Sequence, residues 1–318
     1  MDVPGPDIPA GHPDIPAGHP DIPAGHADIP AGHAVTLPGR GTTWVYDTGP
    51  LAPSAGRVGR RPLVLLHGWT STAALNWFRC FRALRQEFRV IALDQRGHGR
   101  GIRSRRPFRL EDCADDVAAL TEQLGTGPVT AVGYSMGGPV AELLWQRHRD
   151  VVDSLVLCAT APKFASRADM SGPVGALGYG MALALSGVPA GLRRQGFSLL
   201  LRNWTADRGW AAWAIEESQR NDPAALVQAG LSLGRFDATS WIASIDVPTA
   251  VVVTTLDNTV PPSRQWELTQ AIPGARAFPV AGDHRACAEQ ARLFVPAVLA
   301  ACRAVQTAPL DHRATAAT

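Results

Sequence analysis

The sequence predicts an α/β fold, with a mostly parallel central sheet, helices on both of its faces and a helical insertion late in the chain. Short apolar runs alternate with stretches of helical pattern, which is typical of parallel sheets. Most of these runs are apolar at successive positions, as expected for strands buried on both faces. From about residue 163 to 239 no such run occurs, so we predict that this interval is helical and lies between two strands.

The alternation gives the order of the elements. The predicted strands are Thr43–Asp47, Leu63–Leu66, Arg89–Leu93, Val129–Tyr134, Val152–Ala159, Thr249–Thr255 and Ala277–Val280. The predicted helices span about 74–87, 109–124, 137–148, 262–272 and 288–305. We therefore divide the core into 34–162 and 240–306, separated by the insertion at 163–239 and followed by a flexible tail at 307–318.

Composition excludes two classes of protein. The chain has 318 residues, of which 46% are hydrophobic, too many for an intrinsically disordered protein. Its 30 basic and 28 acidic residues leave a net charge of +2, which provides no electrostatic footprint for nucleic acid. The length fits one large α/β domain with an inserted subdomain.

A seven-residue repeat occupies the first 33 residues. PDIPAGH occurs three times and is followed by ADIPAGH, so that His12, His19, His26 and His33 recur at a fixed period. Regularly spaced imidazoles can bind zinc or nickel, whereas a compositional repeat need have no fixed structure. We favour a disordered tail over 1–33, with no metal site, because proline and glycine are dense there.

The remaining features favour a cytoplasmic protein. Cys80, Cys113, Cys158, Cys287 and Cys302 are scattered and form no CxxC pair, which indicates reduced thiols. The N-terminus lacks the pattern of a signal peptide. Ser171–Leu192 carries no charge over 22 residues, but its six glycines and two prolines argue against a membrane span, since a span needs about 20 predominantly apolar residues.

One sequence motif indicates a catalytic residue. It is Gly133-Tyr134-Ser135-Met136-Gly137, which matches the pattern G-x-S-x-G. The motif follows a predicted strand and precedes a predicted helix, the context that a nucleophile elbow requires. The glycines leave room for a sharp turn, and the helix N-terminus favours developing negative charge. We therefore predict that Ser135 is a nucleophile.

A serine nucleophile needs a base, and His284 is the best candidate. It follows the last predicted strand in a loop that can reach over the carboxyl ends of the strands. His148 is expected to lie on a helix surface, and His67 is expected to have a structural role.

The base needs a carboxylate to orient it. Asp257 directly follows the strand 249–255, so the chain order is Ser135, Asp257, His284. Asp283 is the rival, but it is adjacent to His284, and neighbouring side chains rarely face each other.

An oxyanion intermediate needs two hydrogen-bond donors. The first is expected to be the backbone N–H of Met136, the residue after the nucleophile. The second should come from the loop His67-Gly68-Trp69-Thr70, where Gly68 allows a close backbone approach and Trp69 supplies its N–H.

Five segments, LLHGW, LDQRGHGRG, GYSMGG, LDNTVPP and GDH, occur in this order, and together they resemble the α/β-hydrolase superfamily over about residues 40–305. The resemblance implies that Ser135, Asp257 and His284 form a catalytic triad and that the insertion is a cap over the pocket. It also implies that Asp94 and His98 belong to a structural turn.

We therefore predict a serine hydrolase that cleaves a hydrophobic carboxylic ester, lactone or thioester without a metal or organic cofactor. The same triad also serves carbon–carbon bond hydrolases and cofactor-free haloperoxidases or perhydrolases; Arg285 after His284 weakens the first alternative. A non-catalytic ligand-binding protein is a further alternative. Trp204, Trp210 and Trp213 are expected either to line a hydrophobic pocket or to pack the cap on the core.

Overall fold

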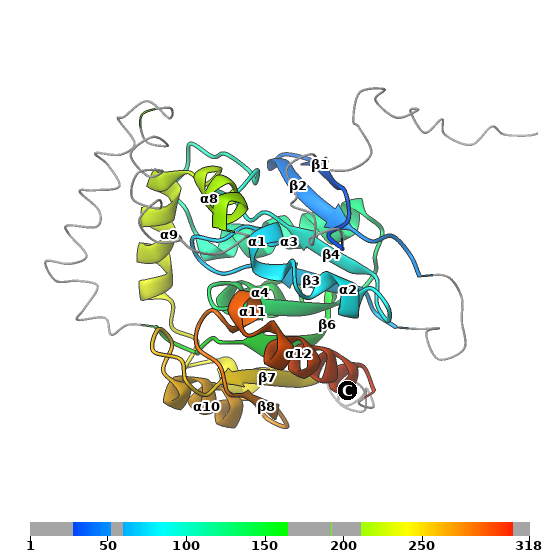
Figure 1. The fold of residues 1–318 in the computed structure, drawn as a ribbon, viewed down its shortest axis with the longest axis vertical. Helices are drawn as coiled ribbons and strands as arrows, with labels where there is room; N and C mark the ends of the chain where they lie inside the picture. The colour runs from blue at the N-terminus through cyan, green and yellow to red at the C-terminus, as the bar shows by residue number, and fades with distance from the viewer. Residues whose placement is uncertain (1–27, 52–59, 165–191, 193–210, 308–318) are drawn as a thin grey trace, which may run out of the picture.

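A computed structural model describes residues 28–51, 60–164, 192 and 211–307. Its centre is an eight-stranded sheet with the order β1-β2-β4-β3-β5-β6-β7-β8 (Figure 1). The strands are β1 Gly32–Leu37, β2 Gly41–Asp47, β3 Leu63–Leu66, β4 Val90–Leu93, β5 Val129–Tyr134, β6 Val152–Cys158, β7 Thr249–Thr254 and β8 Arg276–Val280. β1 and β2 pair antiparallel at one edge, and from β4 to β8 all pairings are parallel. The predicted α/β architecture is confirmed.

Helices cover both faces of this sheet (Figure 1). They are α1 Ala73–Trp77, α2 Phe81–Leu84, α3 Leu110–Gln123, α4 Gly137–Arg147, α8 Ala211–Gln219, α9 Pro223–Arg235, α10 Pro262–Ala271, α11 Ala286–Glu289 and α12 Ala291–Gln306. One core contains residues of α3, α4 and α10, and the other contains residues of α1, α2, α11 and α12.

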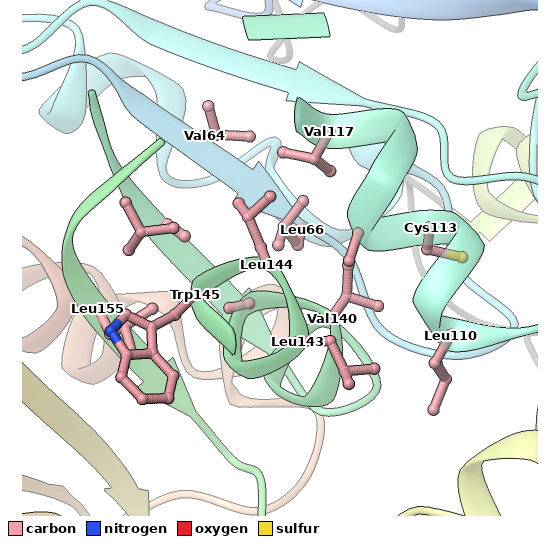
Figure 2. Packing of buried hydrophobic residues seen from close by; sticks show 14 of the residues in the cluster. Val64, Leu66, Leu110, Cys113, Val117, Val140, Leu143, Leu144, Trp145 and Leu155 are labelled. Carbon is pink, nitrogen blue, oxygen red and sulfur yellow. The ribbon is translucent and has the colours of Figure 1, made fainter. Parts of the chain in front are cut away.

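The central strands supply side chains to both cores. All four residues of β3 are buried, with Val64 and Leu66 in the core of α3 and α4 and Leu63 and Leu65 in the opposite core. This follows from the period of two along a strand. Figure 2 shows Val64 and Leu66 facing the side chains of α3 and α4. The uninterrupted apolar runs of the sequence are therefore explained by burial on two faces.

Two predicted helices are each divided. The stretch 74–87 forms α1 and α2, and the stretch 288–305 corresponds to α11 and α12, which begin earlier, at Ala286. The break before α12 occurs at Gln290, whose φ of −115° and ψ of 39° are not helical. The hydrophobic periodicity continues across such a short break, so the sequence pattern does not reveal the break.

The first strand was not predicted, and the fold begins before the expected boundary at residue 34. β1 starts at Gly32, and Ile29 is buried in the core of α12. A Cβ on Gly32 would lie 2.1 Å from the indole nitrogen of Trp44, so glycine permits the close approach of β1 to β2. The last residues of the repeat therefore belong to the sheet.

The described part of the interval 163–239 contains α8, α9 and no strand of the sheet. Lys163 and Asp237 form an isolated β-bridge, and their side chains are 2.9 Å apart in an ion pair. This contact closes the interval near the points where it leaves and rejoins the core. The uncharged run 171–191, Trp204 and Trp210 lie outside the described residues. Trp213 is buried against Phe78, with a ring centroid distance of 5.4 Å.

Three further observations concern the described residues alone. None of their helices has the length and apolar character needed to cross a bilayer. They contain no group of three or more His, Cys, Asp or Glu side chains placed to hold a metal ion. All five cysteines are free and buried.

Candidate active site

The turn at Ser135 connects β5 to α4 and has a strained backbone. Ser135 has a φ of 52°, a value that non-glycine residues rarely adopt. The turn is held by its backbone: the Ser135 N–H donates to Cys158 O at 2.9 Å, and the Gly138 N–H donates to Ser135 O at 2.9 Å. Because β5 ends here, the Ser135 side chain projects at the carboxyl edge of the sheet.

The glycines of the motif are required by close packing. A Cβ on Gly133 would lie 2.2 Å from Gly137 O, and a Cβ on Gly137 would lie 2.2 Å from Leu66 O. Both distances are too short for any side chain, so the sharp turn depends on the glycine at each position.

The structure brings Ser135, His284 and Asp257 together from three separate loops. His284 Nε2 lies 3.0 Å from Ser135 Oγ, and His284 Nδ1 lies 2.8 Å from Asp257 Oδ2. Since the carboxylate can only accept, Nδ1 carries the proton, and Nε2 is free to accept from the serine hydroxyl. The three residues predicted as nucleophile, base and orienting carboxylate are thus in hydrogen-bond contact.

Asp257 is buried, and each of its oxygens has partners. Oδ1 accepts the backbone N–H groups of Thr259 and Val260 at 2.8 and 2.9 Å. Oδ2 accepts the Thr254 hydroxyl at 2.8 Å in addition to His284. Burial acts to raise the pKa of Asp257, but the hydrogen bond and charge of His284, with help from Val260 and Thr254, outweigh it and lower the pKa. The carboxylate is therefore charged at neutral pH.

Gln265 on α10 completes this carboxylate site. Its side-chain NH2 lies 2.9 Å from the Thr254 hydroxyl and 3.3 Å from Asp257 Oδ2. Its carbonyl oxygen accepts the Thr254 N–H at 2.9 Å. The sequence analysis missed both residues, since neither lies in a recognisable motif.

The rival carboxylate points elsewhere. Asp283 Oδ1 accepts the backbone N–H of Arg285 at 2.8 Å, and its other oxygen lies 3.8 Å from the Arg285 guanidinium. The backbone of His284 is held instead by Tyr134, whose hydroxyl donates to His284 O at 2.9 Å. Tyr134, the residue before Ser135, thus connects β5 to the loop that carries His284, another contact that the sequence did not reveal.

The proposed oxyanion donors lie on two adjacent segments. Met136 follows Ser135 as the N-cap residue of α4, and Trp69 is in the loop after β3. Within the described part of the chain neither backbone N–H has a protein acceptor. The loop is close to the nucleophile, because a Cβ on Gly68 would lie 3.4 Å from Ser135 Cβ. The Gly68 N–H donates to Asn76 Oδ1 at 3.0 Å, which fixes the loop.

Three polar side chains near this loop are fully buried: His67, His98 and Asp94. Burial lowers the pKa of His67 to about 4, so its ring is neutral. His67 Nε2 accepts the Gln95 N–H, which leaves the proton on Nδ1, 2.8 Å from Gly68 O. Asp94 accepts the N–H groups of Ala73 and Arg100 at 2.8 Å each. These contacts support the structural roles expected for His67 and Asp94.

Two surface hollows among the described residues lie away from Ser135. One of about 450 Å³ is lined by residues of α3, α4 and α9, and one of about 390 Å³ by the loop 102–108 and the start of α9. They adjoin, because both include Phe108 and Gln228. Ser135, Asp257 and His284 line neither of them.

Comparison with known proteins identifies the family. The sequence model of the alpha/beta hydrolase fold matches residues 61–289. The chain belongs to the alpha/beta hydrolase fold family. A Bacillus subtilis AB hydrolase superfamily protein, YisY, is 25% identical over 70% of this chain and 84% of its own length. A pimeloyl-[acyl-carrier protein] methyl ester esterase from Neisseria meningitidis is 30% identical over 68% of this chain and 83% of its own.

Solved structures agree on the fold. A thermophilic esterase from Thermogutta terrifontis superimposes with a TM-score of 0.68 at 24% identity, covering 87% of this chain and all of that one. At this identity the likeness shows the architecture alone. The family match and the sequence relatives identify this alpha/beta hydrolase as an enzyme of the hydrolase class.

Proposed function

We propose that this alpha/beta hydrolase cleaves a carboxylic ester, lactone or thioester through an acyl-enzyme on Ser135. The observation that carries the proposal is the hydrogen-bonded series Ser135 Oγ, His284, Asp257, with distances of 3.0 and 2.8 Å. The methyl ester esterase among the relatives supports an ester as the substrate.

Acylation follows from this geometry. Ser135 Oγ attacks the carbonyl carbon while its proton passes to His284 Nε2. Asp257 Oδ2 stabilises the resulting imidazolium, and its hydrogen bond to Nδ1 holds the ring in the required tautomer. When the tetrahedral intermediate collapses, the bond to the leaving group breaks and Nε2 returns the proton to that group.

Deacylation repeats these steps with water. His284 accepts a proton from the water, whose oxygen attacks the acyl carbon, and then returns it to Ser135 Oγ as the acid is released. In both halves the oxyanion would accept hydrogen bonds from the N–H groups of Trp69 and Met136, each worth roughly 3–4 kcal/mol in other enzymes. The residues proposed for these steps require no metal or organic cofactor.

We propose further that the insertion 163–239 acts as a cap and that the substrate is a small hydrophobic acyl compound. α8 and α9 support this by packing on the loops after β3 and β4, where the Asp222 N–H donates to Gly97 O at 2.9 Å. The five buried free thiols support a cytoplasmic location, where cysteines stay reduced.

The first test is hydrolysis of p-nitrophenyl esters from acetate to palmitate by the wild type and by Ser135→Ala. We expect kcat of the variant to fall by about 10⁶-fold, as for other serine triads. Ser244→Ala, an exposed serine on the short helix Ile242–Ser244, is the control and should keep full activity.

A fluorophosphonate probe separates the alternatives. Labelling of Ser135 without turnover of these esters would exclude simple esters as substrates, and lactones, diketones and peroxide-dependent reactions would be tested next. If Ser135 is not labelled and the wild type turns over none of these substrates, the proposed enzyme mechanism is wrong and the binding-protein alternative takes its place.

A further inference from the structure

The loop that carries the proposed oxyanion donor is held by the inserted helices as well as by the core. Trp69, Thr70 and Thr72 each contact a residue of α8, α9 or the turn between them. The Trp69 indole N–H donates to Leu226 O at 2.8 Å, and the Thr72 hydroxyl lies 3.3 Å from Glu217 Oε2. These contacts join segments about 150 residues apart in sequence.

Asn221, in the turn between α8 and α9, forms the central contact. It is fully buried, and its side-chain NH2 donates to Thr70 O at 3.0 Å. Its side-chain oxygen accepts the Gly99 N–H at 2.7 Å, so the amide orientation is set by both neighbours. Asn221 therefore joins the loop after β3 to the loop after β4.

Thr70 needs such support because its backbone is strained. Its φ is 63°, which is rare for a β-branched residue and persists only when the surroundings impose it. The peptide group between Trp69 and Thr70 is adjacent to the proposed donor. Loss of the Asn221 contact would allow Thr70 to relax, and the N–H of Trp69 would move with it.

The Trp69 side chain fixes the same residue from the other direction. Its ring lies against Gly230 of α9, where a Cβ would be 2.7 Å from the ring atom Cζ2. The absence of a side chain at Gly230 thus leaves room for the indole ring, and the Leu226 carbonyl accepts a hydrogen bond from the indole N–H. Although 43% of Trp69 remains exposed, its ring is anchored at two points on one helix.

We propose that Asn221 and the Trp69 indole are positioning residues that set the backbone N–H of Trp69 for the transition state. The inference rests on the proposed function and deepens it, because it makes the oxyanion site depend on the inserted helices. A displacement of the donor by about 1 Å is enough to slow an enzyme by about 100-fold.

The test compares an ester with its thionoester, in which sulfur replaces the carbonyl oxygen. Sulfur is a weak hydrogen-bond acceptor, so the thionoester benefits little from oxyanion donors. Asn221→Asp removes the donor to Thr70 at nearly constant size, and Trp69→Phe removes the indole N–H but keeps the backbone N–H. Trp266→Phe on α10 is the control, because Trp266 is similarly exposed, at 37%.

For Asn221→Asp and Trp69→Phe we expect kcat for the ester to fall about 10- to 100-fold with little change in KM, since uniform substrate binding is unaffected. The thionoester rate should fall much less, so the ratio of the ester rate to the thionoester rate falls. Trp266→Phe should keep both rates.

Equal losses on both substrates, together with a lower Tm, would mean that the contacts only stabilise the fold, and would overturn the inference. An unchanged ratio in Trp69→Phe would overturn it even if Asn221→Asp failed to fold. If the wild type shows no hydrolysis that depends on Ser135, the proposed function fails first, and this inference falls with it.

Discussion

At the residue scale, the two oxygens of Asp257 have separate tasks. Oδ1 accepts two backbone N–H groups of its own loop, and Oδ2 accepts His284, Thr254 and Gln265. Because the folded protein lowers the pKa of Asp257, its ionised form stabilises the fold at pH values above the pKa in the unfolded chain. This stabilisation is lost as the pH falls through the lowered pKa, so it contributes to acid unfolding.

Asp257→Asn tests the assignment of the carboxylate. An amide can donate toward Nδ1 and so favour the wrong tautomer of His284, and we expect kcat to fall by about 10⁴-fold, as in serine proteases. Asp283→Asn is the matched control, because Asp283 contacts Arg285 and should cost little activity. A larger loss in Asp283→Asn than in Asp257→Asn would reverse the assignment.

At the element scale, α4, the helix that follows the turn at Ser135, carries a buried carboxylic acid. Glu142 is fully buried, and within the part of the chain that the structure describes neither carboxylate oxygen has a hydrogen-bond partner. Burial raises its pKa from 4.5 to about 8. Between these values the unfolded chain ionises Glu142 while the folded protein keeps it protonated, so the free energy of unfolding falls as the pH rises.

Glu142→Gln should therefore flatten the pH dependence of stability. We expect the Tm of the wild type to fall more than that of the variant between about pH 5 and pH 8, as measured by circular dichroism. Glu122→Gln, at an exposed position on α3, should follow the wild type. Parallel curves for wild type and Glu142→Gln would show that the carboxyl is ionised in the folded state.

At the scale of the whole molecule, the sheet separates two hydrophobic cores, and the N-terminal segment contributes to one of them. Ile29 is only 6% exposed and belongs to the core with α1, α2, α11 and α12. Three residues later, β1 pairs with β2 from Gly32 to Leu37. The segment from Ile29 onward is therefore part of the folded domain.

Ile29→Ala should lower stability by about 2 kcal/mol, the lower end for such truncations because the site is at a sheet edge. For a domain of this size we expect a fall in Tm of about 5 °C. His33→Ala, at an exposed position of β1, should change the Tm little. Equal effects of the two variants would show that burial of Ile29 does not contribute.

The sequence alone determined the order of the core elements and the place of the turn that carries the proposed nucleophile. Seven strands and the turn at Ser135 could be predicted because their signals are local: apolar runs, glycine spacing and a following helix. Chain order and strand ends also pointed to Asp257 and His284, which the structure places in contact with Ser135 and with each other. The missed strand β1 lacks such a signal, because its stability comes from pairing with β2.

Only the tertiary structure decided what supports the site. The contacts of Gln265, Tyr134 and Asn221 join segments that the sequence separates by 8 to 151 residues. No local pattern encodes the direction of such side chains, since it depends on how the elements pack. The contacts of Asp283 and Asp257 differ for the same reason. Both residues follow strands near the site, but the direction of the backbone places Asp283 against Arg285 and Asp257 against His284.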